Sequence, residues 1–107
     1  MSTADPLLTR FMTQARQVTD KIRTAYLFGS RARGTQRPDS DYDLLLVVED
    51  SFTLVEKDAL YDAVMAILLD TGRLVSLKIF KEQIFRPLWE LPTPFMRHVA
   101  EEGIQVG

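Results

Sequence analysis

The sequence contains no cysteine, and its one histidine is His98. Without cysteine there is neither a disulfide framework nor a thiolate metal site, and a single histidine does not make a zinc cluster. Any metal ion that this chain binds is therefore expected to be held by carboxylates.

Long apolar segments are also missing. The longest purely aliphatic run is Leu44–Val48, far short of the roughly 20 residues that a membrane-spanning helix needs. The first five residues carry neither the basic segment nor the apolar core of a secretory signal. We therefore expect a cytoplasmic protein with no membrane partner.

Net charge is small, at −2, but it is unevenly distributed. Residues 1–40 carry 7 Lys/Arg against 3 Asp/Glu, and residues 41–107 carry 6 against 12. Such a chain lacks the extended basic face that binds a long nucleic-acid duplex, and a compact ligand with its own phosphates and a metal ion suits it better.

Its 107 residues fit a single domain, residues 1–107, that buries roughly 65% of its unfolded surface.

The apolar pattern predicts an α/β (or α+β) domain in which helices alternate with strands. Asp5-Pro6 is typical of a helix start, and Gly72 of a helix end. Arg31–Gly34 is expected to open a brief helical turn, and residues 81–92 are left unassigned. The expected elements are a helix from Pro6 to Ile22, a strand Ala25–Phe28, a strand Asp41–Val48, a helix Thr53–Leu69, a strand Leu74–Phe80 and a helix from Pro94 to Gly103.

One short region combines a Gly-Ser turn with paired carboxylates. Gly29-Ser30 follows a predicted strand, ten residues intervene, and Asp41 and Asp43 begin the next strand. Because side chains alternate along a strand, the two aspartates are expected on one face, with Tyr42 pointing away. Neighbouring carboxylates repel each other unless a cation intervenes, and Mg²⁺ prefers oxygen ligands that it shares with substrate phosphates. The pair therefore predicts a Mg²⁺ site and a phosphate-bearing ligand.

The turn itself suits phosphate. Gly29 permits close approach of the backbone, and Ser30 offers a hydroxyl and an N–H. Arg31, Arg33 and Arg37 bring positive charge nearby, and guanidinium groups match phosphate oxygens. The sequence does not say which arginine contacts phosphate, and it leaves open that Arg31 and Arg33 only solvate the turn.

These residues resemble a known signature. The segment 29–49 is similar to the signature of the minimal nucleotidyltransferase (MNT) branch of the DNA polymerase β-like superfamily. The similarity lies in GSRARG at residues 29–34, in SDYDLLLVVE at residues 40–49, and in the spacing between them. The resemblance implies a small mixed sheet backed by helices. It also implies catalytic and metal-binding roles for Asp41 and Asp43, and nucleotide binding by Gly29 and Ser30. Arg31 and Arg33, which bring positive charge nearby, are added to these as candidate nucleotide-binding residues.

Small members of this branch resemble MntA antitoxins, which pair with HEPN-domain toxins. For this chain the resemblance implies Mg²⁺-dependent transfer of AMP from ATP to a hydroxyl of a HEPN-type toxin, within a hetero-oligomer. The preferred nucleotide and the acceptor are not given by the sequence.

One part of the family pattern is missing. Active members carry a third carboxylate on a later strand, and here the matching position is Ser76, or alternatively Lys78. Loss of a metal ligand can cost several kcal/mol of transition-state stabilisation. A degenerate antitoxin that binds nucleotide and partner and acts by occlusion therefore stays open beside the enzyme.

His98 and Trp89 are also considered as functional residues. His98 lies beside Arg97 and is not assigned to catalysis. Trp89, between Pro87 and Pro92, fits a hydrophobic flap, a partner surface or a core anchor, and the frequency with which tryptophan is buried favours the anchor.

Overall fold

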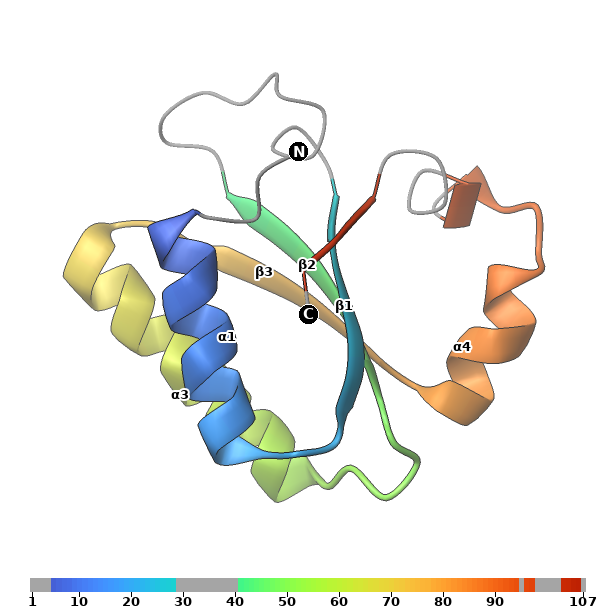
Figure 1. Ribbon diagram of the computed structural model, residues 1–107, viewed down its shortest axis with the longest axis horizontal. Helices are drawn as coiled ribbons and strands as arrows, with labels where there is room; N and C mark the ends of the chain where they lie inside the picture. Colours follow the sequence, from blue (N-terminus) through green and yellow to red (C-terminus); the bar gives the residue numbers. More distant parts are fainter. Residues whose placement is uncertain (1–4, 29–40, 95, 98–102, 107) are drawn as a thin grey trace.

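The computed structural model of this chain describes residues 5–28, 41–94, 96–97 and 103–106, and it shows an α/β fold (Figure 1). A four-stranded sheet has the strand order β3-β2-β1-β4. The elements are α1 (Pro6–Val18), β1 (Ile22–Phe28), β2 (Tyr42–Val48), α3 (Leu54–Thr71), β3 (Val75–Lys81), α4 (Glu82–Trp89) and β4 (Ile104–Gln105).

The sheet is mixed, as the resemblance implies. β1 runs antiparallel to β2 and to β4, while β2 and β3 are parallel and are joined by the crossover helix α3. Parallel neighbours need such a long connection, because the chain must return to the same end of the sheet before it pairs again.

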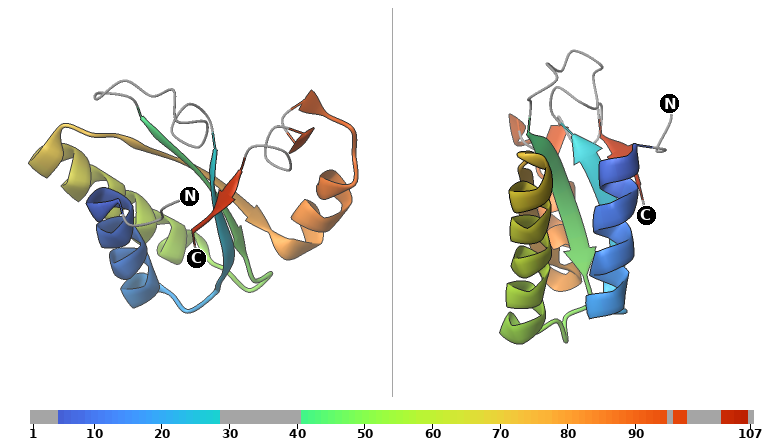
Figure 2. Two further views of the ribbon diagram at one scale, coloured as in Figure 1. Left: turned by 45° about the horizontal axis from the view of Figure 1, so that its top comes forward. Right: turned by 90° about the vertical axis from the view of Figure 1, so that its left-hand side faces the viewer.

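Helices lie on both faces of the sheet. Figure 2 shows α1 and α3 side by side on one face, while α4 lies on the other. Alternate residues of β2 supply the two sides: Leu44 and Leu46 join the main core, and Leu45 and Val47 form a smaller cluster with aromatic side chains. β2 is therefore buried on both sides, which explains its unbroken aliphatic run.

The two long helices begin at side-chain caps. The Asp5 carboxylate accepts from the backbone N–H of Leu7 at 2.9 Å, and Thr53 with Glu56 forms a capping box at the start of α3. Gly72 ends α3 in the left-handed conformation, with φ 72°, as predicted.

Some boundaries differ from the sequence predictions. The first helix ends at Val18, and the backbone of Thr19 is extended, so Ile22 belongs to β1 and its place in the helix was wrong. The interpretation of Trp89 as a core anchor is also wrong: its side chain is 39% exposed, on the unassigned segment that forms α4.

Near the C-terminus, Thr93 caps a helical start at residues 94 and 96–97, as predicted. The predicted turn at Arg31–Gly34 and most of the last helix, residues 98–102, lie outside the described residues. Among the described helices, none has the length and apolar character needed to cross a membrane.

Candidate functional site

The aspartate pair lies at the start of β2. Asp41 immediately precedes the strand and is exposed, and Asp43 is half-buried within it. Asp43 is the register partner of Phe28 on β1 and of Ser76 on β3. Tyr42 is buried in the core between α1, α3 and the sheet, on the opposite side from Asp43. The carboxylate of Asp43 therefore belongs to the face that α1 and α3 leave uncovered.

Electrostatics at Asp43 favour a bound cation. Burial raises the pKa of Asp43, the negative charge of Asp41 raises it further, and the Lys78 ammonium opposes both. A carboxylate in this position is costly to ionise alone. The residues present therefore fit a hard divalent cation such as Mg²⁺, which takes one or two protein carboxylates and completes its shell with water and phosphate oxygens.

β3 brings Ser76 beside this pair. Val75 and Leu77 are buried in the main core, so Ser76 and Lys78 alternate onto the face of Asp43. The register pairs Ser76 with Asp43 and Lys78 with Leu45. Within the described part of the chain, no third Asp, Glu or His joins Asp41 and Asp43 in a group that could hold a metal ion.

Tyr42 anchors the strand that carries the aspartates. Its hydroxyl donates to Asp5 Oδ2 at 2.7 Å, and its backbone N–H donates to the Leu74 carbonyl at 2.9 Å. Asp5 also caps α1, so one carboxylate ties the start of β2 to the start of that helix. Sequence reasoning gave Tyr42 no role, because nothing local links it to a residue 37 positions earlier.

The remaining predicted site residues lie outside the described part of the structure. These are Gly29, Ser30, Arg31, Arg33, Arg37 and His98. β1 ends at Phe28, the residue before Gly29 in the sequence, and Phe28 pairs with Asp43.

An aromatic row extends over the same face of the sheet. Tyr26 and Trp89 stack with ring centroids 6.0 Å apart, and Phe85 packs against Trp89 at 5.3 Å. With Arg86 and Glu90 these rings line a groove of about 330 Å³. Sequence reasoning missed this groove. Of its three aromatic residues, only Trp89 was considered in the sequence analysis, as a possible partner surface among other roles.

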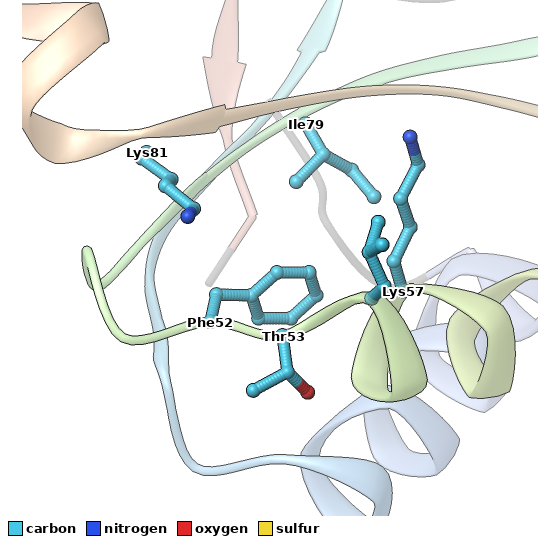
Figure 3. Close-up of a pocket in the computed structure, with 6 residues that line it drawn as sticks. Phe52, Thr53, Lys57, Ile79 and Lys81 are labelled. Atoms are coloured by element: carbon cyan, nitrogen blue, oxygen red, sulfur yellow. The ribbon is translucent and has the colours of Figure 1, made fainter.

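A separate cavity of about 400 Å³ opens at the other end of the sheet (Figure 3). It lies between the start of α3 and the end of β3, where Lys81 pairs with Val48, the last residue of β2. Its lining contains two lysines and no carboxylate, so it does not offer the paired acidic ligands of Asp41 and Asp43. The lining residues are Phe52, Thr53, Leu54, Lys57, Ile79 and Lys81.

Comparison with known proteins places the chain in a family. The family described as "Polymerase beta, Nucleotidyltransferase" matches residues 12–106. A candidate protein adenylyltransferase of Methanocaldococcus jannaschii is 33% identical over 87 residues, which cover 81% of this chain and 81% of that protein.

Solved structures share the fold. A chain in the crystal structure of a toxin–antitoxin with AMP-PNP has 19% identity and a TM-score of 0.59, covering 92% of this chain and 71% of that one. A chain in the structure of a tri-AMPylated Shewanella oneidensis HEPN toxin with an MNT antitoxin has 14% identity and a TM-score of 0.52, covering 92% and 67%. Since the family match spans nearly the whole chain and includes both aspartates, this protein belongs to the polymerase β nucleotidyltransferase family.

Proposed function

We propose that this chain transfers AMP from Mg-ATP to a hydroxyl group of a partner protein, and that the partner is a HEPN-type toxin. The observation that carries the proposal is the aspartate pair, in which burial and the charge of Asp41 raise the pKa of Asp43 on the sheet face opposite α1 and α3. The curated relative is named for protein adenylylation, and the structural neighbours include a HEPN toxin bound to an MNT antitoxin, which supports this choice of acceptor.

The proposed reaction is a displacement at the α-phosphate. The acceptor oxygen forms a bond to the α-phosphorus, the bond from that phosphorus to the bridging oxygen breaks, pyrophosphate leaves, and the hydroxyl proton passes to water. Mg²⁺, when bound, neutralises charge that develops on the phosphate oxygens. Asp41 and Asp43 hold the ion, and Gly29 and Ser30, with Arg31 and Arg33, are proposed to bind the triphosphate.

Lys78 and Ser76 complete the proposed site on β3. Lys78 acts electrostatically on Asp43, so its ammonium partly balances that carboxylate, and we propose that it also attracts phosphate oxygens. Ser76 supplies a hydroxyl beside Asp43, where a third carboxylate would activate the acceptor. We expect slow transfer for this reason.

A second candidate function is a binding-only antitoxin that occludes its toxin. The observation that favours it is that no third acidic residue or histidine joins the aspartates within the described residues. In this case ATP and the toxin both bind, but no AMP is transferred.

Labelled ATP distinguishes the two candidates. The chain is incubated with Mg²⁺, ATP labelled on the α-phosphate and a purified HEPN toxin, and label on the toxin is measured. Transfer that disappears in an Asp41→Asn/Asp43→Asn variant supports the enzyme. A stable complex with no labelled toxin supports occlusion, and neither binding nor label overturns both.

A further inference from the structure

The aromatic groove lies over the smaller core cluster of Leu45 and Val47, and its outer side is open to solvent. Trp89 is 39% exposed, and α4, which carries both Trp89 and Phe85, has no buried residue. The groove measures about 330 Å³, within the size range of small-molecule sites. Tyr26 is stacked on Trp89 and Phe85 is tilted against it, so the partly exposed Trp89 ring offers flat apolar surface that a planar ligand could cover.

The groove lies at a short distance from the proposed metal ligands. Phe28 is the register partner of Asp43, and Tyr26, which lines the groove, is two residues earlier on the same face of β1. Two residues along a strand span about 7 Å. In a nucleotide a single ribose separates the base from the α-phosphate, so a nucleotide with its α-phosphate at Asp43 has its base within reach of this groove.

The rim of the groove is polar. Arg86, which has a side chain 79% exposed, donates to Glu82 at 3.4 Å, and Glu90 at the end of α4 is exposed. A purine base has ring-nitrogen acceptors and an exocyclic group at its edge. The Arg86 guanidinium can donate to such an acceptor, and the Glu90 carboxylate can accept from an exocyclic amine.

We propose that the groove formed by Tyr26, Phe85 and Trp89 binds the purine base of the nucleoside triphosphate. This inference rests on the proposed function, because it places the α-phosphate at Asp41 and Asp43. Stacking on Trp89 supplies affinity, and the rim groups Arg86 and Glu90 contact the edge of the base.

Trp89 is the only tryptophan in the chain, so it reports directly on the groove. Titration with Mg-ATP is expected to quench its fluorescence, whereas Mg-tripolyphosphate, which has no base, is expected to bind without quenching. Calorimetry measures both affinities independently of fluorescence and of any transfer activity.

The test variant is Trp89→Leu, and the matched control is Ile84→Ala, since Ile84 is 51% exposed on the same helix but does not line the groove. Base stacking on an aromatic ring contributes roughly 1–3 kcal/mol, so Trp89→Leu should weaken Mg-ATP binding by about 5- to 150-fold. Tripolyphosphate binding should not change, which also shows that the variant is folded. The control should bind both ligands as the unaltered chain does.

Two failures are distinguishable. In the first, Mg-ATP binds equally well to the unaltered chain and to Trp89→Leu, and it does not quench the Trp89 fluorescence of the unaltered chain. The base then lies elsewhere, and the inference is overturned while the proposed function stands. If neither Mg-ATP nor Mg-tripolyphosphate binds the unaltered chain, the proposed function and the inference both fall.

Discussion

Replacing Tyr42 with phenylalanine removes one hydroxyl from the strand that carries the aspartates. That hydroxyl donates to Asp5 Oδ2 at 2.7 Å, and the Tyr42 side chain is 6% exposed. Hydrogen bonds to charged groups contribute about 1.5–3 kcal/mol. Because Asp5 still accepts from the Leu7 and Leu8 N–H groups in the variant, we expect the lower end, about 1.5 kcal/mol.

The assay is urea unfolding followed by circular dichroism, with a thermal scan alongside. For a domain of this size the expected loss lowers Tm by roughly 6–12 °C. Asp5→Ala should be more destabilising, by roughly 2.5 kcal/mol, because it removes the bond from Tyr42 and also the cap of α1.

A double-mutant cycle then isolates the pair. If the bond acts as described, Tyr42→Phe costs little stability in the Asp5→Ala background, and the coupling energy is about 1 kcal/mol or more. Strictly additive losses would refute the link between β2 and the start of α1. Tyr42→Phe should also weaken Mg²⁺ binding modestly, because Asp41 and Asp43 flank the released side chain.

Three further predictions concern charge. Hydrogen bonds from Thr19, then Lys21, lower the pKa of Glu56 from 4.5 to about 2, so its stabilising effect is complete above pH 4.5 and is lost as pH falls towards 2. Glu56→Gln should therefore flatten acid unfolding in that window, and an unchanged acid profile would contradict this. Asp43 has a raised pKa, so its ionisation reduces folding stability as pH rises through its titration range. Without metal, Asp43→Asn should be at least as stable as the unaltered chain at neutral pH, and Mg²⁺ should raise Tm in the unaltered chain alone. Ser76→Asp should increase AMP transfer at saturating Mg²⁺, with Ser76→Asn as the uncharged control; faster transfer by both would point to a cause other than a new ligand.

Local signals predicted much of the fold. Gly72 ends α3 with positive φ, as predicted, because glycine tolerates that conformation. The capping box of Thr53 and Glu56 is an equally local pattern, but it was not predicted from the sequence. Alternation along β3 was also readable, because each buried residue there is followed by one on the other face. In contrast, Ile22 lies four residues after Val18, a spacing that suits a helix as well as the strand it occupies.

Tertiary contacts account for what the sequence did not predict. Pro87 lies inside α4, and because proline is unfavourable within a helix, the sequence did not indicate a helix there. The two-residue strand β4 exists only because it pairs with the edge of β1. α3 carries exposed Leu54 and Leu69 opposite its buried face, so its apolar pattern does not identify the side that packs.

Part of the candidate site could likewise be predicted from the sequence, and part depends on tertiary contacts. The shared face of Asp43 and Ser76 follows from strand alternation together with a parallel pairing. The Tyr42–Asp5 bond and the stacking of Tyr26 on Trp89 join segments far apart in the chain, so no local pattern indicates them.

Calorimetric titration of Mg-ATP into the unaltered chain and into the Asp41→Asn/Asp43→Asn variant tests the central claim most directly. Circular dichroism first establishes that the variant is folded, which we expect because neither carboxylate is in the core. The account predicts Mg²⁺-dependent ATP binding by the unaltered chain and its loss in the variant, since amides ligate Mg²⁺ poorly. Equal affinity for Mg-ATP in the two folded proteins would contradict it.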